Sequence, residues 1–181
     1  MRLTHRRLAR AEINAIWTID RRELIEGIYY LEGGQLVLKP EHYALLGWPP
    51  GEAELYTPLL EDCYDHGGWF LGLFDDLRLI GEAVLEGRFI GQPRDQLQLK
   101  SLHVSAAYRH QGLGQRRFGL AAAEALSRGA RRLYITATPS EHTVNFYRSL
   151  GCRLAPAPDP DLLALEPDDI HLEYALPQGF Y

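Results

Sequence analysis

Residues 108–118, YRHQGLGQRRF, combine two glycines with a cluster of cations directly before a helical pattern. Glycine weakens a helix, and the first turn of a helix favours acidic rather than basic side chains. Glycines also let a large anion approach the backbone, where the first amides of a helix lack intrahelical partners. The stretch therefore predicts a pyrophosphate-binding loop, to which Arg109, His110 and Arg116 can add positive charge.

Three kinds of nucleotide-binding loop have to be compared with this stretch. A Walker loop requires Lys and then Ser or Thr after its last glycine, whereas Gln115 and Arg116 follow Gly114. A Rossmann loop requires a third glycine and an acid on the next strand, but Arg131 and Arg132 begin that strand. The remaining pattern, Arg-x-x-Gly-x-Gly, resembles the loop of acyltransferases that bind coenzyme A.

Hydrophobic periodicity predicts the elements that position this loop. From residue 69 onward we expect two antiparallel strands (69–74 and 77–87), a third strand (96–104) and a helix (112–128). A strand (131–137), a second helix (141–150), a loop that can include one helical turn (155–169) and a final strand (170–176) should follow. Ser140 is placed to cap the second helix, and Gly129 and Gly151 to end the two helices.

The first 68 residues carry a different pattern. Ile13, Ile16 and Trp17 recur at helical spacing, and Asp20 and Leu24 continue the same face. The whole segment is expected to hold a short strand (1–6), this helix (13–24), a small hairpin (28–38) and a second helix (56–67). The overall order predicts an α/β or α+β fold, with helices around one mixed, mostly antiparallel sheet.

The strand at residues 96–104, QLQLKSLHV, changes phase within its length. Leu97 and Leu99 alternate, and the apolar positions then move to Leu102 and Val104 instead of 101 and 103. A strand keeps its apolar side chains on one face through such a slip only if one residue is inserted, which defines a β-bulge. The pattern also fits a strand that begins late, near Leu102, and leaves both interpretations open.

Bulk properties narrow the class of protein. A chain of 181 residues is long enough for one domain with a full core, so residues 1–181 are expected to form one domain. A net charge of −5 argues against nucleic acid as a partner. Cys63 and Cys152 lack the spacing of a metal site, and free core thiols are favoured over a disulfide. With neither a signal peptide nor an apolar run of bilayer length, the prediction is a cytoplasmic protein without a membrane partner.

Two segments carry a resemblance to a known family. Residues 99–114, LKSLHVSAAYRHQGLG, resemble the central motif of the GNAT superfamily of acyl-CoA-dependent N-acyltransferases. Residues 136–152, TATPSEHTVNFYRSLGC, resemble the second half of that family, which commonly ends in a tyrosine shortly before Leu-Gly. The resemblance extends over 71–176 by element order. The Arg-x-x-Gly-x-Gly pattern alone is a modest signal, and its spacing to the Tyr-Arg-Ser-Leu-Gly helix end makes it strong.

The resemblance implies an N-acetyltransferase domain with a bulged and splayed central strand and acetyl-CoA as cofactor. Residues 1–68 would supply acceptor-side helices, and 69–181 the sheet with the cofactor-binding core. The backbone of the splayed strand would hold the pantetheine arm, and the loop amides would wrap the pyrophosphate. The cofactor-binding residues implied are Leu102, His103, Val104, Arg109, His110, Gln111, Gly112, Leu113, Gly114, Gln115, Ser140 and Asn145. Ser140 departs from the asparagine that many members place nearby.

Amide formation from a thioester needs a neutral amine, a donor to the carbonyl oxygen and a proton for the leaving thiolate. The resemblance assigns the proton to the Tyr147 hydroxyl, and a free amide near Leu102 is a candidate donor. The general base stays open. Gln98 and Ile135 stand where relatives carry glutamates, and the remaining candidates are Glu82, Glu86, His103 and a water chain to bulk solvent.

The acceptor is expected to be a primary amine of a small molecule or a peptide. A cationic amine would suit the acidic residues of the N-terminal segment and of the segment before the last strand. These residues can equally be ordinary surface acids. They are Asp20, Glu23, Glu26, Asp159, Asp161, Glu166, Asp168 and Asp169. Tyr29, Tyr30 and Trp48 are candidates for the pocket wall or for the core. A non-catalytic acyl-CoA-binding or sensor module is the alternative function, and a homodimer is one of the open oligomeric states.

Overall fold

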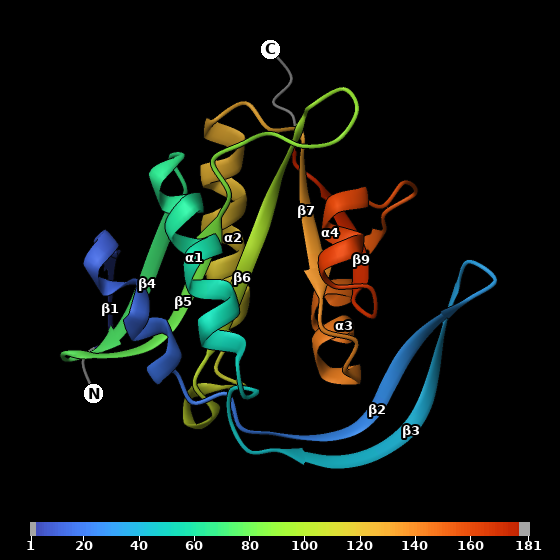
Figure 1. The fold of residues 1–181 in the computed structure, drawn as a ribbon, viewed down its shortest axis with the longest axis horizontal. Helices are drawn as coiled ribbons and strands as arrows, with labels where there is room; N and C mark the ends of the chain where they lie inside the picture. Colours follow the sequence, from blue (N-terminus) through green and yellow to red (C-terminus); the bar gives the residue numbers. More distant parts are fainter. Residues whose placement is uncertain (1–2, 178–181) are drawn as a thin grey trace.

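A computed structural model describes residues 3–177 and has a seven-stranded sheet at its centre (Figure 1). The strand order is β1-β4-β5-β6-β7-β9-β8, and only the β6–β7 pair is parallel. The strands are β1 (Leu3–Arg7), β4 (Trp69–Asp75), β5 (Arg78–Leu85), β6 (Gln96–Val104), β7 (Arg132–Ala137), β8 (Arg153–Leu154) and β9 (Ile170–Ala175). The expected mixed, mostly antiparallel sheet with flanking helices is confirmed.

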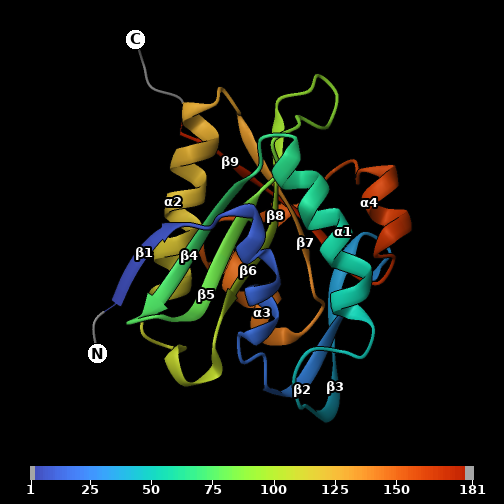
Figure 2. The same cartoon turned by 60° about the vertical axis from the view of Figure 1, so that its left-hand side comes forward.

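Helices cover both faces of this sheet, and Figure 2 shows α1 and α2 on opposite sides of it. The helical elements are η1 (Arg10–Thr18), α1 (Glu52–Asp65), η2 (Ala106–Tyr108), α2 (Leu113–Ser127), α3 (Glu141–Ser149) and α4 (Pro160–Leu165). One core cluster joins α2 and α3 to residues such as Leu85 and Leu99, and the other joins η1 and α1 to residues such as Phe70 and Val84. Consecutive residues Val84 and Leu85 thus face opposite layers, as side chains alternate along a strand.

The predicted bulge is confirmed in β6. Val84 of β5 pairs with Ser101 and the next residue, Leu85, pairs with Leu99, so Lys100 is the inserted residue. The parallel pairing with β7 ends at Leu99, opposite Ile135. Figure 1 shows β6 and β7 diverging beyond their paired end. The alternation rule that exposed the phase slip therefore located the point where the sheet splays.

The N-terminal segment differs from the expectation. The helix predicted to reach Leu24 ends at Thr18, and Leu24 lies instead in a long hairpin of β2 (Glu23–Glu32) and β3 (Gln35–Leu45). The Asp20 carboxylate accepts a hydrogen bond from the backbone N–H of Arg22, a local turn that redirects the chain. The small hairpin expected over residues 28–38 is present but longer, and it extends as a curved arm (Figure 1), so residues 1–68 supply this hairpin as well as helices.

Local capping explains the remaining helices. The Ser140 side chain accepts from the Thr143 N–H and caps α3, as expected. The Asp159 carboxylate accepts from the N–H groups of Asp161 and Leu162, which produces the single short helix α4 in the proline-rich loop. The two-residue strand β8, too short to show a period, was not predicted. Both cysteines are free and buried, which confirms the expectation for them.

Candidate active site

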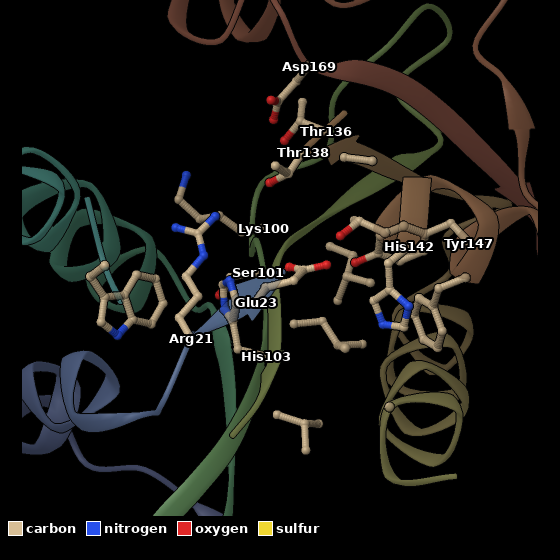
Figure 3. A pocket seen from close by; sticks show the side chains of 18 of the residues that line it. Arg21, Glu23, Lys100, Ser101, His103, Thr136, Thr138, His142, Tyr147 and Asp169 are labelled. Carbon is tan, nitrogen blue, oxygen red and sulfur yellow. The ribbon is translucent and has the colours of Figure 1, made fainter. Parts of the chain in front are cut away.

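A cavity of about 610 Å³ opens where β6 and β7 separate (Figure 3). Its wall comes from both halves of the chain: η1, the open end of the β2–β3 hairpin and α1 on one side, and α2, β7, α3 and α4 on the other. The glycine loop lies at one end of this cavity. The splay that the bulge produces is therefore the structural origin of the site.

The glycine loop enters α2 as the sequence predicted. Gly112 is the N-cap of the helix with φ of 74°, a left-handed conformation that glycine adopts without strain. A Cβ atom on Gly114 would lie 3.3 Å from the ring of Phe146, so a larger residue would crowd α3. The first turn of α2 contains no acidic residue, and its amides have no partner within the helix. This turn fits the diphosphate of coenzyme A.

The basic residues of the loop have different surroundings. The Arg109 guanidinium donates to the backbone carbonyls of Val104, Arg22 and Asp20, and thereby ties the loop to the start of the hairpin. His110 lines the cavity with a positive φ of 60°, and its ring lies 5.6 Å from that of His142 on α3. The sequence analysis missed His142, which nothing distinguishes until α3 is placed beside the loop. Arg116 does not line the cavity.

The β6 edge supplies the next part of the site. Leu102, His103 and Val104 all line the cavity and pair only with β5, because β7 has already diverged. Backbone groups on the β7 side of this stretch therefore have no strand partner among residues 3–177. An extended ligand such as a pantetheine arm fits this edge in the manner of an added strand.

Three of the predicted cofactor residues lie away from this cavity. Gln111 belongs to the loop but is not part of the wall. Ser140 uses its hydroxyl to cap α3, and the Asn145 Oδ1 accepts a hydrogen bond of 2.8 Å from the Tyr29 hydroxyl. Ser140 and Asn145 instead line a second cavity of about 490 Å³ between β2 and α3.

Tyr147 of α3 lies in the cavity wall and is 6% exposed. Its ring packs against those of Phe118 and Phe146, which fixes its position. Burial, with smaller contributions from Cys152 and Glu82, raises the pKa of the Tyr147 hydroxyl. The phenol thus stays protonated and can give its proton only to a strong base.

The base candidates occupy different places. The His103 Nδ1 lies 2.5 Å from Glu82 Oε1, and the His103 ring lines the cavity. Glu86 lies outside the cavity wall. Burial disfavours the charge of Glu86, but the hydrogen bond from Arg88 and the charge of Lys100 outweigh burial and lower its pKa. Gln98, which cannot accept a proton, is part of the wall.

Aromatic and basic side chains from the N-terminal half of the chain form one part of the cavity wall. The Trp48 ring packs edge-on against Trp17 at 4.8 Å between ring centroids, and Arg21 lies over it at 4.9 Å. Arg21 also forms an ion pair of 2.7 Å with Glu52 of α1. The Trp48 position in the wall confirms its place among the pocket candidates, whereas Tyr30 is exposed on the hairpin arm.

Acidic side chains from β2 and from the segment around α4 form another part of the cavity wall. Glu23, Glu166 and Asp169 line the cavity, and Glu23 Oε1 has no hydrogen-bond partner among the described residues. Tyr56 donates a hydrogen bond to Glu166. Burial, followed by the charge and hydrogen bond of Glu166, raises the pKa of Asp169 to about 7. Five of the predicted acids do not line this cavity: Asp20, Glu26, Asp159, Asp161 and Asp168.

Comparison with known proteins agrees with this geometry. The model of the GNAT acetyltransferase family matches residues 37–152, which is more than half of the chain. The chain therefore belongs to the GNAT acetyltransferase family. A search of curated proteins gives no significant match.

Solved structures with the same fold extend over nearly the whole chain. Nourseothricin acetyltransferase has a TM-score of 0.73 and 19% identity, with 98% of this chain and 100% of that chain covered. A Bacillus anthracis protein described as a streptothricin acetyltransferase, in complex with acetyl coenzyme A, has a TM-score of 0.68 and 15% identity. The match covers 99% of this chain and 100% of that chain. PaiA N-acetyltransferase from Thermoplasma acidophilum, in complex with coenzyme A, has a TM-score of 0.63 and 16% identity. The match covers 97% of this chain and 99% of that chain.

Family membership settles the class of enzyme and its cofactor. The protein is an acyltransferase, and the cofactor of its family is acetyl-CoA. The glycine loop, the unpaired β6 edge and Tyr147 are the parts of this chain that suit that cofactor. No helix within residues 3–177 is long and apolar enough to cross a bilayer.

Proposed function

We propose that residues 1–181 form one domain that transfers the acetyl group of acetyl-CoA to a primary amine of a cationic small molecule or peptide. The single observation that carries this proposal is the continuity of the cavity. The same cavity wall includes the glycine loop and the unpaired β6 edge as well as Glu23 and Asp169. Tyr147 and His103 also line it.

The protein groups around this cavity have separate roles in the proposal. Backbone amides of the α2 first turn bind the diphosphate, and the β6 edge near Leu102 orients the thioester and donates to its carbonyl oxygen. The Tyr147 hydroxyl, which stays protonated in the cavity wall, is assigned as the group that protonates the leaving sulfur as the carbon–sulfur bond breaks. Trp17 and Trp48 exclude water from the acceptor end of the cavity.

Charge supports a cationic acceptor. The unpaired oxygen of Glu23 and the Glu166–Asp169 pair face the cavity, while Arg21 is already paired with Glu52. A carboxylate that lacks an internal partner is stabilised by an incoming ammonium group, and a neutral acceptor would leave it unpaired. The acceptor should therefore carry a second positive charge besides the amine that reacts.

Thiol release tests this proposal directly. The purified protein is incubated with acetyl-CoA and a panel of polyamines, aminoglycosides, basic peptides, nourseothricin and neutral amino acids. We expect acceptor-dependent thiol release that is strongest with polycationic amines. Glu23→Gln should raise KM for those amines more than for neutral amines. A rate that does not depend on acceptor charge would contradict the cationic acceptor.

The alternative, a module that binds acyl-CoA without turnover, gives a different result. Calorimetry with coenzyme A and acetyl-CoA would show binding in both cases. Absence of thiol release across the whole panel, in protein that binds acetyl-CoA, would favour the binding module. Absence of binding to either ligand would overturn both functions.

A further inference from the structure

Glu82 of β5 and His103 of β6 form a cross-strand pair next to the bulge. Residues opposite each other in an antiparallel pair share one face of the sheet, so the two side chains meet directly. The distance between His103 Nδ1 and Glu82 Oε1 is 2.5 Å. Glu82 is fully buried, whereas 26% of the His103 side chain is exposed. The pair thus connects a buried carboxylate to the cavity.

The surroundings of Glu82 support a charged carboxylate in the core. Its second oxygen, Oε2, accepts a hydrogen bond of 3.1 Å from the Ser101 hydroxyl. Arg117 of α2 is 2% exposed, and its Nε has no hydrogen-bond partner in the described part of the chain; burial lowers the pKa of this guanidinium, and the charge of Glu82 acts in the opposite direction. A buried carboxylate without such groups would be strongly destabilising.

A carboxylate partner fixes the state of the imidazole ring. An ionised Glu82 has no proton to donate and acts only as a hydrogen-bond acceptor, so His103 Nδ1 carries the proton in this contact. The lone pair of the neutral ring then lies on Nε2, and the partner holds the ring in one orientation. Trp48 restricts the ring further by packing edge-on at 4.8 Å between centroids.

His103, Ser101, Glu23 and Tyr147 are all among the side chains that line this cavity (Figure 3). The charged residues that share this cavity wall are Arg21, Glu23, Glu52, Lys100, Arg109, Glu166 and Asp169, from η1 to α4. Arg21 is held by Glu52 and Lys100 by Glu86. Three histidines line the wall, His103, His110 and His142, and of these three only the His103 ring is held by a carboxylate among the described residues.

We propose that His103 is the general base of the acetyl transfer and that Glu82 is its positioning residue. This inference rests on the proposed function and adds a residue to it. His103 Nε2 takes a proton from the amine nitrogen as that nitrogen forms a bond to the thioester carbonyl carbon. The carbon–sulfur bond breaks, and the thiolate takes a proton from Tyr147. The protonated His103 then releases its proton to solvent and the Tyr147 oxygen takes one from solvent, which returns both groups to their starting state.

The test measures kcat/KM against pH for the wild type and for His103→Gln, Glu82→Gln and Glu86→Gln, and His103→Ala serves for rescue by imidazole. His103→Gln should lower kcat/KM by roughly 100-fold or more at neutral pH, in the range of general acid–base catalysis. It should also remove the acid limb of the pH profile and leave acetyl-CoA affinity unchanged. Added imidazole should restore part of the activity of His103→Ala.

Glu82→Gln separates positioning from structure. Loss of the carboxylate releases the ring from its fixed orientation, so kcat should fall while the affinity for acetyl-CoA stays unchanged. A merely structural role would lower that affinity and the free energy of unfolding together with kcat. Glu86→Gln is the matched control, since Glu86 is also a buried acid near the end of the same strand but lies outside the cavity wall. Its profile should match the wild type.

The outcomes distinguish this inference from the proposed function. The wild type could turn over while His103→Gln keeps the same kcat/KM and the same acid limb of the pH profile. This result would overturn the role of His103 and leave the transferase function intact. Loss of activity in His103→Gln without imidazole rescue of His103→Ala, and with reduced acetyl-CoA affinity, would show a cofactor-binding role instead and also overturn it. A wild type without acceptor-dependent thiol release would overturn both.

Discussion

Leu99 of β6 pairs with Ile135 of β7, and this is the last paired position before the two strands separate. The next residue, Lys100, is the bulge. A bulge bends its strand and increases the local twist, so its position directly after the last pair accounts for the splay. The cavity that holds the proposed active site opens at this point.

Deletion of Lys100 should therefore close the cofactor site without unfolding the protein. The shortened strand, QLQLSLHV, alternates apolar and polar residues throughout, and both halves keep their buried faces. We expect coenzyme A affinity to fall by on the order of tenfold or more, because backbone hydrogen bonds worth about 0.5–1.5 kcal/mol each would go to β7 instead. Calorimetry measures the affinity, and Lys100→Ala, which keeps the bulge, is the control. Unchanged affinity after the deletion would separate the bulge from cofactor binding.

Tyr147→Phe should lower kcat far more than it changes the affinity for acetyl-CoA. The ring that packs against Phe118 and Phe146 remains, and only the proton donor is lost. A general acid contributes on the order of 100-fold or more, so kcat should fall by that amount. Phe146→Leu, which removes a neighbouring ring but no donor, is the matched control for packing. Equal kcat in Tyr147→Phe and the wild type would remove the proposed role of the hydroxyl.

Gly112→Glu should abolish coenzyme A binding, and Gly112→Gln should weaken it much less. Both side chains bear the same strain at φ of 74°, and open space surrounds the added Cβ in each case. Only glutamate places a negative charge at the helix N-terminus beside the diphosphate. Calorimetry of the two variants isolates this charge. Equal affinities would mean that the anion binds elsewhere.

Asp169 should make folding stability depend on pH near neutrality. Its pKa of about 7 in the folded protein exceeds the ordinary value of 3.8, so the folded state binds the proton more tightly. The resulting stabilisation is complete below pH 3.8 and is lost as pH rises to about 7, with a slope of at most about 1.4 kcal/mol per pH unit. Asp169→Asn should flatten this part of the profile, as measured by denaturant unfolding between pH 5 and pH 8. Parallel profiles would contradict the raised pKa.

His171 contributes a slope of the opposite sign. Burial lowers the pKa of its ring from the ordinary value of 6.5, so its stabilisation is present above that pH and is lost as the pH falls. The comparison of Asp169→Asn with the wild type removes this contribution, since both proteins keep His171.

Most of the sheet and the cofactor end of the site could be predicted from the sequence. The phase slip in residues 96–104 fitted either a bulge or a late strand start, and the pairing with β5 decides for the bulge. The glycines with the following apolar spacing located the start of α2. Both signals are local, because backbone conformation and side-chain period are properties of a few consecutive residues. The helix predicted through Leu24 was wrong for the same reason: a helical period in Ile13 to Trp17 does not show where a turn at Asp20 ends it.

The sequence by itself determined the order of the elements, the phase slip at Lys100 and the loop that fits a diphosphate. The tertiary structure alone decided which polar side chains meet. Glu82 and His103 come together through strand register, and Tyr56 reaches Glu166 from another element altogether. Such contacts depend on how strands pair and helices pack, and no short stretch of residues encodes the distance between two groups far apart in the chain.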